Sequence, residues 1–407
     1  MLPVNGIEHC LKCSICHAAC PVARANPNYP GPKILGPDRG RFMMNKSGKT
    51  VPEVEWCTNC QRCEVACPHG VETASLIRAL KQEALHEKKH YWRDLLMGYP
   101  HILGQLGTAF SPIANFMLGS PIGRSMTAQM MALAPDSSLP AYAGRSFQSW
   151  HRGQGHTASS NKVVYFVGCF ANYNRPEIGQ ALVALLKLLD IDVIVPKQVC
   201  CGVPLLSNGF RDRALKLMSY NVQNLLPYVK QGYSIICSCP SCGLALKKEY
   251  GRELGTSEAA RVGAAVYDSS EYLDIYGQAL EEHLSAQSWR LTYHQPCHSL
   301  AQGIGTPSLS LLRKIPGVQV SFVDGCCGQS GTYGLKEEKS GVSRQIGRQL
   351  IEAITDQKPD LVATDCGTCS LQLSRLSDLP VEHPLVLLEK AAGGAAAGLG
   401  DRYRPAV

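Results

Sequence analysis

Two cysteine runs near the start of the chain constrain its fold more than any other feature. Each has the spacing C-x2-C-x2-C-x3-C followed by proline, and the runs are Cys10, Cys13, Cys16, Cys20 and Cys57, Cys60, Cys63, Cys67. This spacing is typical of loops that bind [4Fe–4S] clusters, because three thiolates reach irons of one cubane and the fourth ligates the neighbouring cluster. The sequence therefore predicts cluster 1 on Cys10, Cys13, Cys16 and Cys67, and cluster 2 on Cys57, Cys60, Cys63 and Cys20.

Zinc and disulfides are the alternatives for these cysteines. Structural zinc sites usually take separated C-x2-C pairs rather than four cysteines in one short run. Disulfides require an oxidising compartment, and the start MLPVNGIEHC has no apolar stretch of signal-peptide length. Residues 1–90 are therefore expected to form a ferredoxin-like α+β domain that holds both clusters and ends in a helix.

Length and composition fit a folded soluble or peripheral protein of two or three domains. The chain has 407 residues, of which 45% are hydrophobic and 18% charged. Its net charge of +7 is expected to offset the anionic clusters, and no arginine-rich run or aromatic platform indicates nucleic-acid binding. No apolar stretch is long enough to predict a transmembrane helix. Neither a G-x-G-x-x-G turn nor a P-loop is present, so the substrate-oxidising flavin site is expected on another chain.

A low-charge segment follows the cysteine runs. A helix is expected from Thr73, as N-cap, towards Trp92. In the segment 95–135, the only Asp, Glu, Lys or Arg is Arg124, and prolines and glycines break the segment into short pieces. It is expected to bury its apolar surface in another domain, a partner subunit or the membrane interface. With the polar linker that follows, it makes up a connecting segment over residues 91–160.

From residue 161 onward the chain repeats itself. Cysteines recur at offsets of 128 (Cys169 and Cys297), 126 (Cys200 and Cys326) and 127 (Cys239 and Cys366). A nearly constant offset indicates duplication of one unit. Because buried strands alternate with amphipathic helices in both copies, each copy is expected to be an α/β domain with a mostly parallel sheet.

The predicted elements set the domain boundaries. Strands are expected at 162–168, 192–195, 233–236, 290–293, 318–323 and 360–363, and the longer helices at 177–189, 211–229 and 336–355. We name the two copies CCG domains after their Cys-Cys-Gly motif. The first is expected over residues 161–285 and the second over 286–390, followed by a flexible tail over 391–407.

Each copy gathers five cysteines at the ends of its predicted strands. They are Cys169, Cys200, Cys201, Cys239 and Cys242 in the first copy, and Cys297, Cys326, Cys327, Cys366 and Cys369 in the second. A cubane has four iron corners, so five thiolates favour a [4Fe–4S] cluster opened out from the cube, with one thiolate bridging two irons. The alternatives are a zinc site on four of the five and a buried cluster that only packs. One or two such non-cubane clusters are expected.

Cys237 and two histidines lie close to these motifs. Cys237 falls in a strand-like run, where we expect a small core residue; as a ligand it would substitute for Cys239. His294 and His298 flank Cys297. Each is expected either to be a hydrogen-bonded structural histidine, or to orient a ligand or move a proton during quinone chemistry.

Longer stretches around these motifs resemble one family. Along nearly its whole length the chain resembles the C subunit, which is the iron–sulfur subunit, of anaerobic glycerol-3-phosphate dehydrogenases. Beyond both cysteine runs, the matching stretches are NPNYPGPKILGPD (26–38), GCFANYNRPEIG (168–179), CCGVPLLSNGF (200–210), CCGQSGTYGLKEE (326–338) and TDCGTC (364–369). The CCG half alone is also similar to the iron–sulfur subunits of glycolate and lactate oxidation systems and to heterodisulfide reductase subunits.

The resemblance implies an electron-transfer subunit with no catalytic residue of its own. A flavoprotein partner would oxidise sn-glycerol 3-phosphate to dihydroxyacetone phosphate, and electrons would pass through this chain to menaquinone. The complex would lie peripherally on the cytoplasmic face of the inner membrane. The heterodisulfide reductase relatives imply non-cubane clusters on the five-cysteine sets. The alternatives are a subunit of a 2-hydroxy-acid oxidase and a subunit that mainly docks the complex to the membrane.

Overall fold

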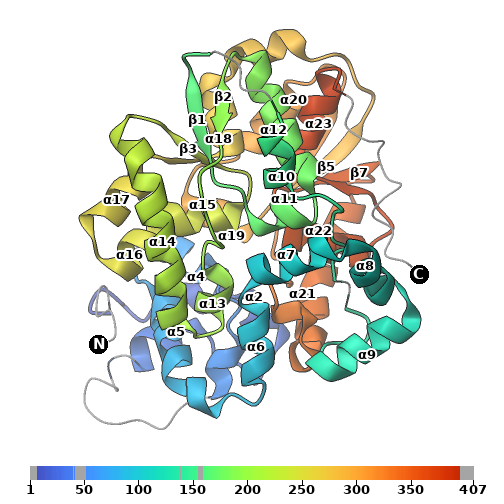
Figure 1. Ribbon diagram of the computed structural model, residues 1–407. Helices are drawn as coiled ribbons and strands as arrows, with labels where there is room; N and C mark the ends of the chain where they lie inside the picture. Colours follow the sequence, from blue (N-terminus) through green and yellow to red (C-terminus); the bar gives the residue numbers. More distant parts are fainter. Residues whose placement is uncertain (1–6, 40, 42–51, 138, 155–158, 395–407) are drawn as a thin grey trace.

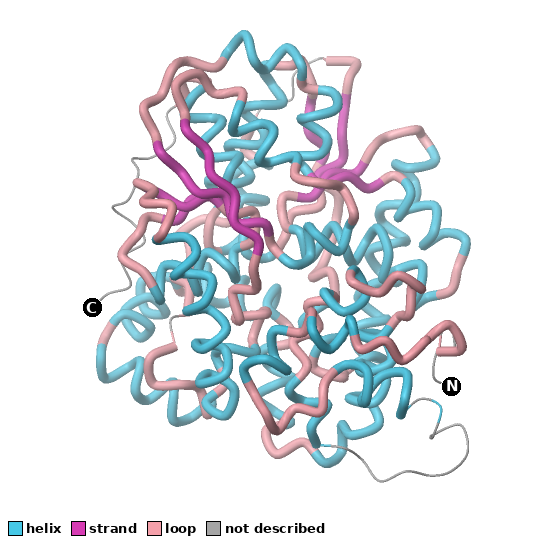
Figure 2. The backbone as a smooth tube through the Cα atoms, turned by 180° about the vertical axis from the view of Figure 1, so that it is seen from behind, coloured by secondary structure: helices cyan, strands magenta, loops and turns pink. Residues whose placement is uncertain are grey.

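The chain folds into a helical N-terminal part and two small parallel sheets with helices around them (Figure 1). The computed structural model describes residues 7–39, 41, 52–137, 139–154 and 159–394. All strands of this described part follow residue 161. Figure 2 shows the two sheets as separate groups of strands at one end of the molecule.

The two sheets have the same topology. The first contains β1 (Lys162–Tyr165), β2 (Asp192–Ile194), β3 (Ile235–Cys237) and β4 (Val266–Asp268) in the order β2-β1-β3-β4. The second contains β5 (Arg290–Gln295), β6 (Gln319–Asp324), β7 (Leu361–Ala363) and β8 (Val381–Glu382) in the order β6-β5-β7-β8. Every pair of neighbouring strands is parallel. The predicted fold class, an α/β unit present in two copies behind a ferredoxin-like part, is confirmed.

Helices connect the strands of each sheet. In the first copy they are α11 (Cys169–Tyr173), α12 (Pro176–Leu188), α13 (Val203–Ser207), α14 (Arg211–Lys230), α15 (Pro240–Leu244), η4 (Ala245–Glu249), α16 (Tyr250–Leu254), α17 (Ser257–Ala264), α18 (Ser269–Tyr276) and η5 (Gln278–His283). In the second they are α19 (Cys297–Gln302), α20 (Pro307–Arg313), η6 (Tyr333–Leu335), α21 (Glu337–Thr355), α22 (Gly367–Leu376) and α23 (Pro384–Ala391).

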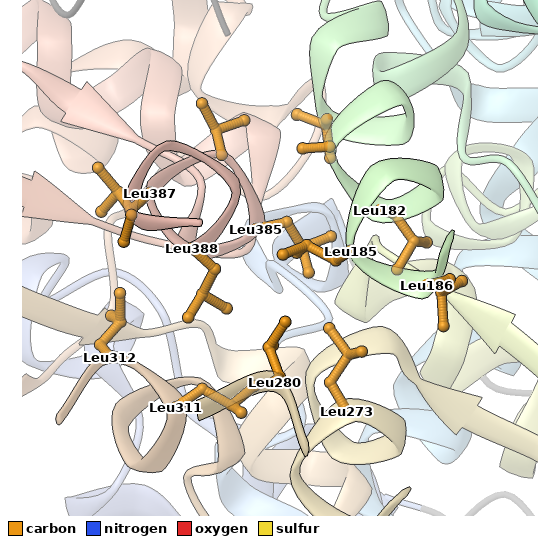
Figure 3. Close-up of a cluster of buried hydrophobic side chains, with 14 of the residues drawn as sticks. Leu182, Leu185, Leu186, Leu273, Leu280, Leu311, Leu312, Leu385, Leu387 and Leu388 are labelled. Atoms are coloured by element: carbon orange, nitrogen blue, oxygen red, sulfur yellow. The ribbon is translucent and has the colours of Figure 1, made fainter. Parts of the chain in front are cut away.

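A leucine-rich core joins the two CCG domains (Figure 3). Leu182 and Leu185 of α12 lie beside Leu385 of α23, with Leu273 and Leu280 below them. These side chains are at most 1% exposed, and burying each one contributes about 1.5–3 kcal/mol. Because both domains contribute to one core, the cysteine-bearing ends of the two sheets are held in a fixed relation.

The N-terminal part was expected to be α+β, but in its described residues it contains no strand and is built from short helices. They are α1 (Ile15–Ala18), α2 (Pro21–Ala25), η1 (Ile34–Asp38), η2 (Pro52–Trp56), α4 (Arg62–Val65) and α5 (Thr73–Glu83). α1 and α4 occupy the same place in the two cysteine runs, each beginning after a residue in the left-handed conformation.

The long helix predicted from Thr73 towards Trp92 is wrong in its length and its cap. Thr73 is the first residue of α5, and Glu72 precedes it as N-cap. The helix ends at Glu83 and is followed by η3 (Ala84–Glu87) and α6 (Tyr91–Met97). The chain breaks because Lys88 is extended, with ψ of 118°, and its buried Nζ binds Glu55 and Asp94.

The low-charge segment forms three short helices, as its prolines predicted. They are α7 (Pro100–Ala109), α8 (Ser111–Gly119) and α9 (Pro121–Met131), each with proline at its first or second position. Proline suits that position because the N–H it lacks would have no helical partner. α8 and α9 lie at the lower right of Figure 1, and α7 lies nearer the centre, where it packs against α11 of the first CCG domain. None of the described helices has the length and apolar character needed to span a bilayer.

The linker and the tail are described only in part. α10 (Phe147–Arg152) occupies the start of the expected linker, whose residues 155–158 lie outside the described residues. Ala391, placed in the expected tail, is a fully buried residue at the end of α23. Residues 395–407 lie outside the described part. The domain boundaries as such stay predictions.

Buried charges fasten the N-terminal part to both CCG domains. Arg78 of α5 pairs with Glu249 of η4, with side chains that are 4% and 3% exposed. Asp94 of α6 binds Lys336, which precedes α21, at 2.9 Å. Lys336 also donates to Asn208 of the first CCG domain at 2.7 Å. Separating such a pair leaves a buried charge without a partner, which costs free energy. These pairs therefore hold the parts in one relative position.

Candidate iron–sulfur sites

The first cysteine set lies at the surface of the N-terminal part. Cys10, Cys13 and Cys16 line a pocket together with Cys67 from the second run. Cys13 is exposed and the other three are half-buried. Burial, with the nearby Cys10 and Cys67 thiols, raises the pKa of Cys16 above its ordinary value. The structure thus brings together the four residues predicted for cluster 1.

The second set lies deeper in the N-terminal part. Burial, with the neighbouring Cys60 and Cys57 thiols, raises the pKa of Cys20 to about 12. Burial and the same two thiols also raise the pKa of Cys63. Cys20 and Cys63 are each 8% exposed. The fourth cysteine of each run therefore lies with the first three of the other run, which is the crossed grouping that the spacing predicted.

The two cysteine loops have the same backbone shape. Lys12 and Ser14 have φ of 60° and 66°, and Asn59 and Gln61, at the matching places, have φ of 57° and 59°. Each such left-handed residue costs about 1–2 kcal/mol when it is not glycine. The turns bring successive cysteines to one side of the loop. The Asn59 N–H also donates to Cys57 Sγ at 3.4 Å, a bond that suits a negatively charged sulfur.

The five cysteines of the first CCG domain meet at the carboxyl ends of its strands. Cys169 begins α11 after β1, Cys200 and Cys201 follow β2, and Cys239 and Cys242 lie at the start of α15 after β3. The Cys169 thiol raises the pKa of Cys200, and the Cys200 thiol raises the pKa of Cys201 to above the ordinary range. The Cys201 and Cys239 thiols do the same to Cys242. The thiols therefore form one contiguous group.

The second CCG domain repeats this arrangement. Cys327 Sγ lies 3.1 Å from Cys369 Sγ, and the Cys326 thiol, with burial, raises the pKa of Cys297. The Gly328 N–H donates to Cys326 Sγ at 3.4 Å. A hydrogen bond with Cys369 lowers the pKa of Cys366 to about 6. These contacts join Cys297 to Cys326, and Cys327 to Cys369 and Cys366, and the neighbouring Cys326 and Cys327 connect the two groups through the backbone.

The donor sets fit iron–sulfur clusters. All nineteen cysteines are free thiols, and groups made only of thiolates are the ligands that such clusters use. N–H groups donate to sulfur in both the N-terminal part and the second CCG domain. Among the described residues, no three His, Cys, Asp or Glu side chains surround a single point as they would one metal ion. The assignment of each cysteine as an iron ligand stays a prediction.

The histidines beside Cys297 are held by other protein groups. His294 contacts Thr364 Oγ1 and the Gly325 carbonyl, each at 3.1 Å. His298 contacts the Asn59 carbonyl at 3.0 Å and Ser241 Oγ at 2.8 Å. His294 is buried and His298 is half-buried, and their removal from water lowers the pKa of both, that of His294 to about 4. These contacts favour the structural alternative, since His298 ties the second cysteine loop to both CCG domains.

Cys237 lies in β3 and is fully buried in the core of the first CCG domain. Burial raises its pKa well above the ordinary value, and the nearby Asp268 and Cys239 add to the shift. Its place in the strand agrees with the expected small core residue.

The second cysteine set touches the second CCG set directly. A hydrogen bond links the Cys60 and Cys297 thiols, and together with burial it raises the pKa of Cys60. Arg62 Nε donates to Cys297 Sγ at 3.3 Å, and the same guanidinium pairs with Asp324. The sequence did not predict Arg62 or Asp324. The one signal that could have found them is a break in the repeats, since the matching residues are Ile15 and Gln198.

Family models match both parts of the chain. A 4Fe-4S dicluster domain matches residues 6–71, and a cysteine-rich domain, CCG, matches residues 163–247 and 291–374. These matches confirm the ferredoxin-like part and the duplicated CCG domains, and they indicate iron–sulfur clusters in both.

Curated relatives cover the chain from end to end. The C subunit of the anaerobic glycerol-3-phosphate dehydrogenase of Escherichia coli K12 is 33% identical, over 95% of this chain and 99% of the relative. The B subunit of the fumarate reductase (CoM/CoB) of Methanothermobacter marburgensis is 28% identical over 95% of this chain and 72% of the relative. The D subunit of the dihydromethanophenazine:CoB–CoM heterodisulfide reductase of Methanosarcina acetivorans is 24% identical, over 95% and 94%.

The resemblance inferred from the sequence is therefore confirmed at the level of the family. Two of the motifs that carry it meet in the structure, because the second cysteine run contacts the second CCG domain through Cys60, Arg62 and Cys297. On this identity and coverage, the chain belongs to the family formed by the C subunit of anaerobic glycerol-3-phosphate dehydrogenase.

Proposed function

We propose that this chain carries electrons from a flavoprotein subunit, which oxidises sn-glycerol 3-phosphate to dihydroxyacetone phosphate, to menaquinone at the cytoplasmic face of the inner membrane. The names of its relatives describe subunits of dehydrogenase and reductase complexes. Oxidation of the substrate releases two electrons and two protons. The electrons pass through this chain one at a time, and the quinone takes up both electrons with two protons.

The observation that carries the proposal is the row of thiol groups from the surface to the interior. Cys13 is the one exposed cysteine of the described residues, so the cluster 1 set is the face that a donor can approach. The second set lies behind it and contacts the second CCG set through Cys60 and Cys297. The two CCG sets adjoin in turn, because α15 packs on α19 and the Phe170 ring covers Gly367, which follows Cys366.

The chain's own residues hold and tune the redox centres. The clusters supply one-electron oxidation and reduction without making bonds or moving protons. Cys10, Cys13, Cys16 and Cys67 would hold cluster 1, and Cys57, Cys60, Cys63 and Cys20 cluster 2. The five-cysteine sets would each hold a non-cubane [4Fe–4S] cluster. Burial and N–H donors at the sulfurs set the potentials, and burial increases from the first set to the second.

An apolar helical face supports contact with the membrane. The large exposed side chains on α7–α9 are Ile102, Leu106, Phe110, Ile113, Phe116, Met117, Ile122, Met126 and Met130. Several of these side chains are largely exposed, with Phe116 at 72% and Ile122 at 76%. Contiguous apolar surface of this kind marks a binding site. Since Arg124 is its only charged residue, we propose that lipid at the membrane interface covers this face.

Iron analysis tests the proposal. For anaerobically purified protein, four tetranuclear clusters give about 16 irons and matching acid-labile sulfide per chain, whereas cubanes alone give about 8. We expect about 16. A value near 8 would rule out electron transfer through the CCG domains and would favour a docking subunit whose CCG sites are empty or hold zinc.

Spectroscopy and substrate choice complete the test. In EPR-monitored reduction, Cys201→Ala and Cys327→Ala are each expected to remove one signal and leave the cubane signals in place. Variants that leave every iron signal unchanged would show the CCG assignment to be wrong.

With the purified complex, glycerol 3-phosphate is expected to reduce the clusters, and glycolate or lactate is not. The opposite result would identify a 2-hydroxy-acid oxidase subunit.

A further inference from the structure

The two CCG domains differ where the second one meets the N-terminal part. By the offset of 126, Asp324 at the end of β6 corresponds to Gln198 in the first copy. Gln198 is bonded within its own domain, where its side chain accepts from the Val167 N–H at 3.2 Å and donates to the Val167 carbonyl at 2.7 Å. Asp324 instead pairs with Arg62, which lies between Cys60 and Cys63.

Arg62 connects the cluster 2 loop to the second CCG domain with all three of its nitrogens. Nε donates to Cys297 Sγ at 3.3 Å, Nη1 donates to Asp324 Oδ2 at 3.2 Å, and Nη2 pairs with Asp324 Oδ1. The Arg62 side chain is 15% exposed and that of Asp324 is 41% exposed. At the matching place in the first cysteine run stands Ile15, an exposed apolar residue. The guanidinium is therefore a feature of the second cysteine loop and the second CCG set that the matching positions of the first loop and the first set do not share.

We propose that Arg62 is a positioning residue that raises the reduction potential of the centre held by the second CCG set and makes this centre the first acceptor of electrons from cluster 2. The inference rests on the proposed function, because it requires a redox centre at Cys297. The thiols of Cys60 and Cys297 are hydrogen-bonded, so the two centres would be adjacent through their ligands.

The direction of the effect follows from charge. Reduction adds one electron, and a cation bonded to a ligand sulfur in a partly desolvated site stabilises the reduced form. A centre held by the set of Cys60 would give up one electron and a centre held by the set of Cys297 would take it up, with no exchange of bonds or protons. Asp324 partly neutralises Arg62, so removing its charge is expected to raise the potential further. Removing the charge of Arg62 is expected to lower it.

The test is a set of matched variants followed by EPR during reductive titration, with iron content measured for each. Arg62→Gln removes the cation and keeps a polar side chain. Asp324→Asn removes the counter-charge. Arg290→Gln is the control, because Arg290 forms an Arg–Asp pair with Asp360 at the opposite end of the same sheet. The signal of the second CCG centre is identified as the one that Cys327→Ala removes.

We expect Arg62→Gln to lower the reduction potential of that centre by about 59 mV, which corresponds to a tenfold change in the one-electron equilibrium constant. Asp324→Asn is expected to shift it upward, and Arg290→Gln to leave it in place. An unchanged potential in Arg62→Gln with full iron content would overturn the role of Arg62 and leave the proposed function standing. If Arg62→Gln loses iron, the potential of Asp324→Asn is the test. An upward shift supports the role of Arg62, and an unchanged potential overturns it. A wild-type protein with no signal sensitive to Cys327→Ala would refute both.

Discussion

A glycine follows each adjacent cysteine pair, and the two glycines differ in the space around them. Gly202 has φ of +88° and Gly328 has φ of +77°, a region that residues with a side chain rarely adopt. A Cβ on Gly328 would lie 2.2 Å from the Ser343 carbonyl oxygen in α21, whereas a Cβ on Gly202 would lie 3.4 Å from the Ala214 carbonyl oxygen. A side chain at position 328 therefore requires the backbone of α21 to move.

Alanine substitutions at these glycines are expected to differ in cost. Gly202→Ala should lower the free energy of unfolding by about 1–2 kcal/mol, the cost of a left-handed alanine. Gly328→Ala should cost clearly more, because the clash is added to the same strain. Urea unfolding followed by circular dichroism measures both. Equal losses would mean that the contact between Gly328 and α21 does not constrain the loop.

At the residue scale, the site was predictable where chemistry fixes spacing. The spacing of the cysteine runs predicted which thiols lie together, because a cubane imposes its geometry on a short loop. Arg62 and Asp324 could not be predicted in the same way. They are 262 residues apart in sequence, and no periodicity records a contact that only the packing of two domains creates.

At the element scale, the fourth strand of each sheet is what the sequence did not predict. β1, β2, β3, β5, β6 and β7 lie where apolar runs predicted them, with ends shifted by up to three residues. β4 has three residues and β8 has two. Each ends in an acidic residue, Asp268 or Glu382, rather than continuing as an apolar run, so only pairing with β3 and β7 makes them strands.

The apolar face of α7–α9 gives a prediction at the same scale. Phe116→Ser combined with Ile122→Ser should weaken binding to anionic phospholipid vesicles by at least tenfold, because each large apolar side chain contributes about 1.5–3 kcal/mol when buried. Both side chains are exposed, so the free energy of unfolding should change by less than about 0.5 kcal/mol. Vesicle co-sedimentation measures the binding.

Ile275→Ser on α18 is the matched control, since Ile275 is 48% exposed and lies outside this face. It should bind vesicles as the wild type does. If the double variant binds vesicles normally but no longer co-purifies with the flavoprotein subunit, the face contacts that subunit and the lipid proposal is wrong.

At the scale of the whole molecule, buried ion pairs make the joint between the parts sensitive to acid. Although burial opposes its charge, Arg78 holds the pKa of the Glu249 carboxyl below its ordinary value. A carboxyl with a lowered pKa contributes stability above its ordinary pKa of about 4.3, and this is lost as the pH falls through the lowered value. The joint should therefore be strongest near neutral pH.

Glu249→Gln tests this expectation. At pH 7 it should cost about 3 kcal/mol, the low end for breaking a buried pair, because Arg78 keeps Glu253 at 3.4 Å. The difference from wild type should begin to narrow below about pH 4.3, where the carboxyl of the unfolded chain takes up a proton, and should be lost below the lowered pKa of the folded carboxyl. The difference is measured from the urea unfolding midpoints of both proteins across this pH range. A loss of iron at low pH that both proteins share cancels in that difference. A difference that stays constant with pH would contradict the pairing.

The burial of the second cysteine loop has a consequence for how the protein is made. Thr58, Asn59 and Gln61 are 4–5% exposed, and the loop backbone is bonded to Ser330 and His298 of the second CCG domain. Of the four cysteines of this set, Cys20 and Cys63 are buried, so an iron donor has little access to them once these contacts have closed. We therefore expect maturation to follow an order, with the inner centre inserted before the domains dock. The outer centre, at the surface around Cys13, can be filled last and repaired in the finished protein.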